Sequence, residues 1–309
     1  MKISIVVPVY NNQGNLLPLY EDLQEKFFSK IDYEYELVMV NDGSKDESYK
    51  IMCELASRDK HIKIYSLSRN FGAYAAVLCG ISKATGDCIM VKAADLQEPT
   101  EMIFDMVKSW QKGNNVVLAV REARDDDAIS TFFANRYYSL VRKTAFPNMP
   151  IGGFDVYLID KKVAKVLELL DEKNSSDTSL ILWSGFKTDI VYYHRVARKI
   201  GKSQWTFRKK FRLVTDTLFS FSTVPVATVW VIGLFCSFGA LIWALYVFIE
   251  KLRGAIPVEG WTTIVIFQLF SFGVIMLTLG ILGEYLWRIF DSSRKRPPYI
   301  IEDDNEEDR

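Results

Sequence analysis

The sequence predicts an α/β domain with a mainly parallel sheet, followed by two membrane-spanning helices. Across the first two hundred residues, short apolar runs alternate with amphipathic ones, a pattern typical of a parallel sheet covered by helices. Two long apolar runs, residues 223–249 and 261–283, then follow without any Asp, Glu, Lys or Arg. Each is longer than the roughly 20 residues that a helix needs to cross a bilayer.

The apolar runs of the first part are expected to form strands because their continuous β-branched content suits burial on both faces. These predicted strands are residues 3–10, 36–40, 62–67, 88–92, 116–120 and 190–194. The amphipathic runs are expected to form helices. These predicted helices are residues 16–28, 47–57, 74–84, 100–112, 129–144, 161–170 and 178–183.

This arrangement predicts where a ligand would bind. Parallel α/β sheets bind ligands beyond the carboxyl ends of their strands, so residues 9–12, 41–44, 68–70 and 93–97 should converge. Asp42 and Asp95 lie in these segments, and their oxygens suit Mg²⁺ or Mn²⁺ holding a diphosphate. The ordinary alternative for each is a helix N-cap, which we prefer for the neighbouring Asp46 but not for Asp95.

The charges indicate a membrane rather than a nucleic acid as partner. Basic and acidic residues balance at 38 each, so no overall field attracts nucleic acid. Eight basic residues and no acidic one lie in residues 195–212, whereas the connection between the apolar runs carries only Lys251 and Arg253 as basic residues. Because basic residues gather on the cytoplasmic side of spanning helices, we expect both ends of the chain in the cytosol.

The segments around the apolar runs add further expectations. Residues 202–221 mix basic and aromatic side chains, as an amphipathic helix at a lipid surface does. Residues 302–308 are acidic and expected to be disordered, and residues 298–301 are a candidate strand against a neighbouring chain. Small residues of the second run permit close helix contact, so we expect a homo-oligomer, with a tetramer as one candidate.

Four motifs occur in a specific order: Val-Pro-Val-Tyr-Asn (7–11), Val-Asn-Asp-Gly-Ser-Lys-Asp (40–46), Ser-Arg-Asn-Phe-Gly (68–72) and Ala-Asp-Leu-Gln-Glu-Pro (94–99). Together they resemble family 2 glycosyltransferases with the GT-A fold. Within that family the chain is similar to the membrane-bound polyprenyl-phosphate glycosyltransferases, namely bactoprenol glucosyltransferases and, more distantly, dolichol-phosphate mannose synthases. The resemblance runs from residue 2 to about residue 300, and it rests on the ordered set because each motif alone is weak.

The resemblance implies a role for individual residues. Asp95 would ligate the metal, and Asp155 would lie near the acceptor as a base or an orienting group. The residues implied in donor binding are Pro8, Tyr10, Asn12, Asp42, Ser44, Arg69, Lys92 and Gln97, with Arg69 near the diphosphate. At the membrane edge, Arg198 and Lys202 would bind the lipid phosphate beside Trp205.

Three positions depart from the family pattern. Ala93 replaces the usual first Asp of the metal motif, which leaves one carboxylate fewer. Either the affinity for the metal is lower, or Lys92 compensates by contacting phosphate directly. Asn12 replaces a Glu that many relatives carry. Gln204 replaces a basic residue of the membrane-edge motif.

The implied function is inverting transfer of one sugar from a nucleotide sugar, with UDP-glucose as first guess, to undecaprenyl phosphate at a bacterial inner membrane. The expected organisation is a GT-A domain (1–200), interfacial helices (201–222), a transmembrane hairpin (223–288) and a cytosolic tail (289–309). A processive polysaccharide synthase is one alternative, although this chain has two spans and no Gln-x-x-Arg-Trp motif. A catalytically inactive membrane scaffold is another alternative, motivated by Ala93.

Overall fold

The computed structural model describes residues 1–122, 136, 138–170, 175–196, 215–217, 219–253 and 260–304. The chain divides into two compact units: unit 1 comprises residues 1–214 and 296–309, and unit 2 comprises residues 215–295. Unit 2 is therefore inserted in the sequence of unit 1 and joined to it by two covalent connections.

In its described residues, unit 1 contains an eight-stranded mixed sheet with the order β7-β5-β6-β4-β1-β2-β3-β8. Its strands are β1 (Lys2–Val9), β2 (Glu34–Asn41), β3 (Ile62–Leu67), β4 (Cys88–Val91), β5 (Val116–Arg121), β6 (Val156–Asp160), β7 (Thr188–Tyr193) and β8 (Ile301–Asp304). The central strands β4, β1, β2 and β3 run parallel, and β7 runs parallel to β5. Strand β6 is antiparallel to both β4 and β5, and β8 is antiparallel to β3.

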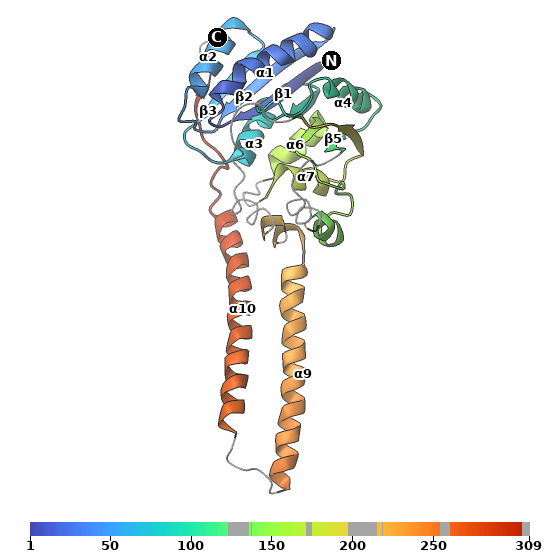
Figure 1. Cartoon of the computed structure of the whole chain (residues 1–309). Coiled ribbons are helices and arrows are strands. Elements are labelled where there is room, and N and C mark those ends of the chain that lie inside the picture. Colours follow the sequence, from blue (N-terminus) through green and yellow to red (C-terminus); the bar gives the residue numbers. More distant parts are fainter. Residues whose placement is uncertain are drawn as a thin grey trace. The chain divides into compact units, whose positions relative to one another are not determined.

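Helices cover both faces of this sheet (Figure 1). They are α1 (Gln13–Lys26), the short 3-10 helix η1 (Phe28–Lys30), α2 (Ser48–Arg58), α3 (Ala73–Lys83), α4 (Met102–Gln111), α6 (Lys161–Leu169) and α7 (Asp177–Trp183). Helices α1, α2 and α4 share one apolar core with alternate residues of β1, whereas α3 packs against the opposite face. There Gly80 of α3 directly faces Val6 and Val40.

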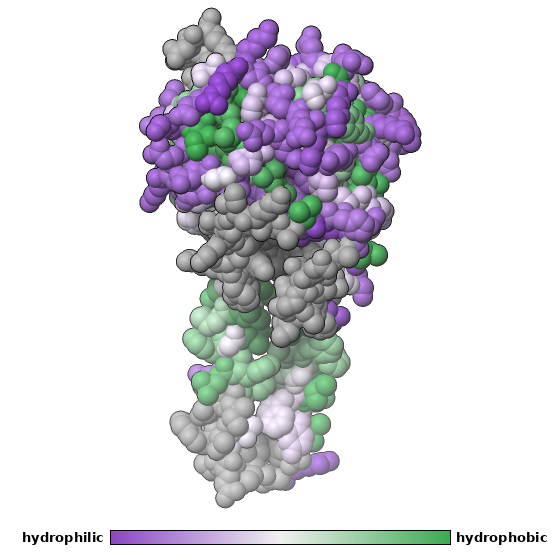
Figure 2. Space-filling model, turned by 45° about the horizontal axis from the view of Figure 1, so that its top comes forward, coloured by the Kyte–Doolittle hydropathy of each residue, from purple (hydrophilic) through white to green (hydrophobic). Residues whose placement is uncertain are grey.

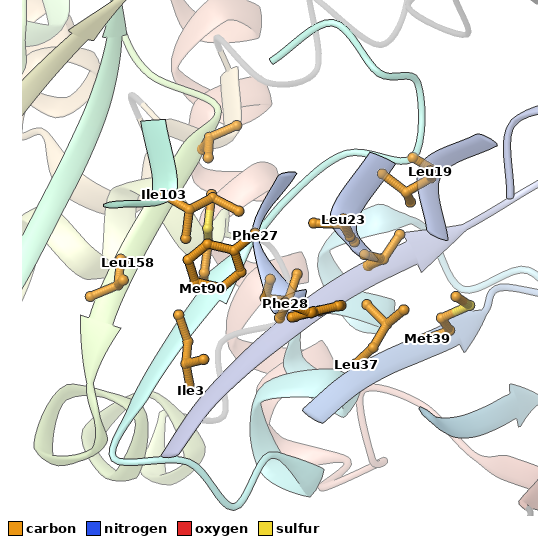
Figure 3. Close-up of a cluster of buried hydrophobic side chains, with 14 of the residues drawn as sticks. Ile3, Leu19, Leu23, Phe27, Phe28, Leu37, Met39, Met90, Ile103 and Leu158 are labelled. Atoms are coloured by element: carbon orange, nitrogen blue, oxygen red, sulfur yellow. The ribbon is translucent and has the colours of Figure 1, made fainter. Parts of the chain in front are cut away.

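The larger core lies under α1 and α4. Leu19 and Leu23 of α1 pack toward Leu37 and Met39 of β2, and Phe27 fills the space between the helices and β4 (Figure 3). All of these side chains are fully buried. Alternation of inward-facing residues along the strands thus fixes which face each helix covers.

A buried carboxylate organises the amino-terminal edge of the sheet. Glu36 is 2% exposed and accepts hydrogen bonds from Ser4 Oγ at 2.5 Å and from the Thr85 backbone N at 2.6 Å. Lys2 Nζ lies 2.8 Å and Lys63 Nζ 3.8 Å from Glu36 Oε2. Burial alone would raise the pKa of Glu36, but the hydrogen bonds from Lys2, Ser4 and Thr85 bring it below its usual value.

Unit 2 contains two long helices, α9 (Val224–Leu252) and α10 (Trp261–Ser293). Within them, Val224–Trp243 and Phe267–Ser293 are long and apolar enough to cross a membrane. Many apolar side chains of these two helices are exposed. In the view of Figure 2 the described surface of the helices is mainly hydrophobic, whereas that of unit 1 is mainly hydrophilic. Arg288 of α10 donates to Asp216 Oδ1 at 2.8 Å and Glu284 Oε1 at 2.9 Å, so a charged cluster ties residues 215–217 to this helix.

The main sequence expectations for the fold are confirmed, with two corrections. The mainly parallel sheet, the predicted strands and helices up to residue 120 and the two apolar helices are present. Their ends differ from the predicted ones by up to three residues, except that α10 continues to Ser293, ten residues beyond the predicted apolar run. Strand β6, however, was not predicted and inserts antiparallel between β4 and β5. The candidate strand at 298–301 was placed against a neighbouring chain, whereas β8 pairs with β3 of the same chain, which also makes part of the acidic tail ordered.

We predict that Glu36→Ala destabilises the protein by about 3 kcal/mol, because it leaves buried donors without their acceptor. Since the pKa of Glu36 is depressed by folding, its contribution is present at neutral pH and is lost as the pH falls below about 4.3, the ordinary value for Glu. Thermal unfolding in detergent at pH 7 and pH 4 measures both effects. The exposed Glu34 on the same strand is the control, and equal effects of Glu34→Ala and Glu36→Ala would contradict the prediction.

Candidate functional site

The four predicted segments do follow neighbouring strands. In the order β4-β1-β2-β3 all four strands are parallel, so their carboxyl ends open on one edge of the sheet. Two backbone hydrogen bonds join β1 to the residues that follow its neighbouring strands at this edge. Asp42 N, after β2, donates to Val9 O at 2.8 Å, and Lys92 N, after β4, donates to Val6 O at 3.0 Å. This edge is the candidate site.

The Asp42 carboxylate holds the β3–α3 loop, residues 68–72. Asp42 is 2% exposed. Its Oδ1 accepts from Phe71 N at 2.7 Å, and its Oδ2 accepts from Asn70 Nδ2 and from Gly72 N, both at 3.0 Å. The loop that follows β3 is therefore fixed to the end of β2 by a buried, charged acceptor, an arrangement stronger than neutral hydrogen bonds.

Hydrogen bonds also join the loop that follows β1 to the loop that follows β2. Asn11 N donates to Ser44 Oγ at 3.1 Å, and Lys45 N donates in return to Asn11 Oδ1 at 2.9 Å. Asn12 N donates to Ser48 Oγ at 2.9 Å at the start of α2. Asn11 has a positive φ of 50°, a conformation that asparagine tolerates better than most residues.

The β3–α3 loop presents Arg69 at this edge. Arg69 is exposed, and its guanidinium carbon lies 3.9 Å from the centroid of the Phe71 ring. The guanidinium is stacked on a ring that Asp42 holds through Phe71 N, and its Nη1 donates to Asn70 O at 3.2 Å, so this exposed cation has a defined position. The planar, five-donor guanidinium suits the oxygens of a diphosphate.

Asp95 and its neighbours form the part of the edge that follows β4. Asp95 is half-buried, and its Oδ1 accepts from Gln97 N at 3.3 Å. Gln97 is bound to the chain that follows β7: Arg195 donates to Gln97 Oε1, and Val196 N donates to Gln97 O at 2.9 Å. The segment carrying Asp95 is therefore fixed to the beginning of the basic run.

Strand β6 brings Asp155 to the same edge. Because β6 is antiparallel to β4, it begins where β4 ends, with Tyr157 opposite Val91. Asp155 precedes Val156, is 61% exposed and forms an ion pair with Arg121 at the end of β5. Arg121 Nε also donates to Tyr193 Oη at 3.3 Å. An exposed carboxylate and a guanidinium are thus paired at this edge of the sheet.

Lys92 has a different environment from the one expected. Its side chain is fully buried, and Nζ donates to Glu98 O at 2.7 Å and lies 3.6 Å from Glu98 Oε2. Burial lowers the pKa of Lys92 and raises that of Glu98. The ammonium group thus faces Glu98 within the segment that carries Asp95, and the direct contact of Lys92 with phosphate stays a prediction.

The donor set at this edge fits a metal shared with a ligand rather than a closed protein site. Among the residues that the structure describes, no group of three His, Cys, Asp or Glu side chains is placed to hold a metal ion. Mg²⁺ commonly uses one or two carboxylates and completes its shell with substrate phosphates and water. The half-buried Asp95 is a suitable single carboxylate for such a site.

Comparison with known proteins identifies the family. The model for "Glycosyl transferase family 2" matches residues 4–168. A bactoprenol glucosyl transferase of Shigella phage SfV is 34% identical over 99% of this chain and 100% of its own length. The uncharacterized glycosyltransferase YkcC of Bacillus subtilis is 36% identical over 98% of this chain and 94% of its own.

This chain belongs to glycosyl transferase family 2. The fold agrees, because the crystal structure of mannosyl-3-phosphoglycerate synthase from Rubrobacter xylanophilus matches with a TM-score of 0.50 and 13% identity, covering 71% of this chain and 72% of that one. At that identity the likeness concerns the GT-A fold alone.

In this family 2 glycosyltransferase the structure brings together most of the predicted site residues. Pro8, Tyr10 and Asn12 are half-buried at the end of β1, and Ser44 contacts Asn11. Arg198, Lys202 and Trp205 lie outside the described residues, so their predicted role at the membrane edge stays a prediction.

Two arginines had no individual role in the sequence analysis but belong to the site. Arg121 directly follows a predicted strand, so the rule that selected the other strand ends applies to it as well. Arg195 is the first residue of the basic run at 195–212. Its bond to Gln97 depends on the pairing of β7 with β5, which the sequence does not show.

We predict that Gly43→Ala disrupts the site. A Cβ at Gly43 would lie 2.5 Å from Asn70 N and 2.6 Å from the Arg69 carbonyl carbon, and φ is +65°. Backbone atoms cannot move aside as a flexible side chain would, so the β3–α3 loop must shift. Gly113→Ala is the matched control, because Gly113 has a φ of +89° but open space around it.

The strain of a positive φ alone costs about 1–3 kcal/mol, and both variants carry it. Only Gly43→Ala should also weaken nucleotide binding, as measured by titration with UDP. Similar UDP affinities in the two variants would show that the close approach of the two loops is not required.

Proposed function

We propose that this glycosyltransferase transfers one sugar, with inversion, from a nucleotide sugar to a polyprenyl phosphate at the cytosolic membrane surface. The observation that carries the proposal is the combination of the site at the carboxyl edge of the sheet with two helices apolar enough to span a bilayer. The near full-length similarity to a protein named bactoprenol glucosyl transferase supports both the acceptor and glucose as the sugar.

The donor would bind across the ends of β1, β2 and β3. The Pro8 to Asn12 segment and the β2 end at Asp42 and Ser44 would form the nucleotide pocket. Because both oxygens of Asp42 already accept hydrogen bonds from the β3–α3 loop, we assign Asp42 to shaping this pocket as well as to lining it. Arg69 would bind the diphosphate.

A divalent cation, Mg²⁺ or Mn²⁺, would be held by Asp95 together with the donor diphosphate. When bound, it would neutralise the charge that develops on the departing nucleotide. Ala93 leaves Asp95 as the one carboxylate of the usual pair, so we expect the diphosphate to provide a large share of the metal's ligands.

The acceptor would approach from the side of Asp155. A phosphate monoester has a second pKa of about 6, so it is largely dianionic at neutral pH and needs no strong base to attack the anomeric carbon. Arg121, which is paired with Asp155, would attract this anion, and Asp155 would orient Arg121 and the acceptor. Attack from the face opposite the nucleotide inverts the configuration of the sugar.

The basic run is proposed to collect the lipid phosphate. Arg198 and Lys202, with Trp205 at headgroup depth, would attract anionic lipid within a Debye length of the surface. Two spanning helices would place both ends of the hairpin on the same side of the membrane. Residues 1–200 and the tail from 289 would then lie on the cytosolic side of a bacterial inner membrane.

A direct assay tests the whole proposal. Purified full-length protein is incubated with undecaprenyl phosphate, a panel of nucleotide sugars and Mg²⁺ or Mn²⁺, and lipid products are identified by mass. One sugar per lipid phosphate supports the proposal. A polymer would instead indicate a processive synthase, and tight lipid binding without turnover for any donor would indicate an inactive scaffold.

We predict that Asp95→Asn lowers transfer by at least about a hundredfold while the protein stays folded, because the metal loses its charged protein ligand. The control is Asp105→Asn, which neutralises an exposed carboxylate on α4. Product formation is measured at saturating metal. Activity of Asp95→Asn equal to that of Asp105→Asn would refute the role of Asp95.

We also predict that Lys202→Ala or Trp205→Ala raises the KM for undecaprenyl phosphate more than the Kd for UDP. The reason is that these residues are assigned to the lipid phosphate and not to the nucleotide. Kinetics with varied lipid in detergent micelles and UDP titrations measure the two effects separately. Equal losses in both would argue against an acceptor site at the membrane edge.

A further inference from the structure

The chain returns to unit 1 after α10 and adds a last strand to the sheet. Strand β8 pairs antiparallel with β3, with Leu67 opposite Ile301 and Ser66 opposite Asp303. The pairing extends beyond the strand, because Ser68 N donates to Ile300 O at 3.0 Å. Ser68 is the first residue of the β3–α3 loop, so this last segment reaches the loop that carries Arg69.

Two tyrosines anchor this segment, residues 299–304, which we call the C-terminal strap. Tyr299 Oη lies 2.8 Å from Ser82 Oγ on α3, and the Tyr299 ring is half-buried. On the other side, Tyr49 Oη of α2 donates to Asp303 Oδ2. The strap is therefore fixed to the two helices that flank β3 in the sequence as well as to β3 itself.

The β3–α3 loop is consequently held from two directions. Asp42 binds its far end at Asn70, Phe71 and Gly72, and the strap binds its near end at Ser68. Arg69 lies between these two attachments. Its backbone is restrained on each side, whereas its guanidinium lies against the Phe71 ring and donates to the Asn70 carbonyl oxygen at 3.2 Å.

We infer that the C-terminal strap is a positioning segment for the donor site: it restrains Ser68 and so holds Arg69 where it binds the donor diphosphate. The inference rests on the proposed function for the identity of that ligand. Its physical basis is a population effect. If only a fraction of the molecules has the binding-competent loop, the apparent Kd rises in inverse proportion to that fraction.

The test compares two truncations of the full-length protein in detergent. Truncation after Arg296 removes the strap, whereas truncation after Asp304 retains it and serves as the matched control. Hydrogen–deuterium exchange of residues 68–72 measures the restraint directly and needs no ligand. Titration with UDP and transfer kinetics then measure its consequence.

We expect truncation after Arg296 to speed amide exchange in residues 68–72 and to raise the Kd for UDP. If the fraction of molecules with the binding-competent loop falls to a tenth, each change is about tenfold. Exchange of β1 amides and kcat should stay within about twofold of the control. Unchanged exchange and UDP affinity would overturn the inference, and so would a general loss of protection that leaves the UDP affinity of the folded fraction unaltered.

A milder variant covers the case in which the truncated protein does not fold. Tyr299→Phe removes only the hydroxyl that contacts Ser82, and Tyr192→Phe is the control on the exposed edge strand β7. A rise in UDP Kd and in exchange of residues 68–72 for Tyr299→Phe alone supports the strap; identical values for the two variants refute it. Failure of the unaltered protein to bind UDP would refute UDP as the donor nucleotide, while the exchange measurements would still decide the role of the strap.

Discussion

The buried carboxylate of Asp42 accepts hydrogen bonds from three consecutive residues of the β3–α3 loop, and the geometry of the candidate site depends on it. Through this group the ends of β2 and β3 become one unit, and Phe71 is held beneath Arg69. A carboxylate enclosed in this way is stable only while its donors are present, because an unpaired buried charge is costly. Gly43 lies within the same contact and has no room for a side chain.

The two edges of the sheet differ in how completely their buried polar atoms are bonded. At the amino-terminal edge, Glu36 is surrounded by Lys2, Ser4, Lys63 and Thr85. At the carboxyl edge, Glu98 Oε2 and Arg195 Nε are buried without a hydrogen-bond partner in the part of the chain that the structure describes. Unmet hydrogen-bonding capacity of this kind is expected near a binding site, where ligands and water complete the network.

The proposed reaction joins a water-soluble donor to an acceptor whose tail stays in the bilayer, and the chain combines the parts that this requires. Unit 1 carries the site, and unit 2 carries the apolar helices and is joined to unit 1 at both ends. Because the second connection leads into the C-terminal strap, the chain that leaves α10 becomes part of the sheet next to the β3–α3 loop. The strap that contacts the β3–α3 loop therefore begins only a few residues after the end of α10.

Much of the protein was determined by the sequence alone. β-branched runs such as 3–10 and 62–67 fix the central strands by local preference and burial, and the position of Asp42 and Asp95 after such runs follows directly. The apolar helices follow from composition. The tertiary structure decided the contacts between segments that are distant in sequence. The antiparallel insertion of β6 brings Asp155 to Arg121, the folding of the Asp95 segment buries Lys92 against Glu98, and the return of β8 to β3 reaches Ser68. No periodicity encodes these contacts, because they depend on which strands become neighbours and which side chains the packing encloses.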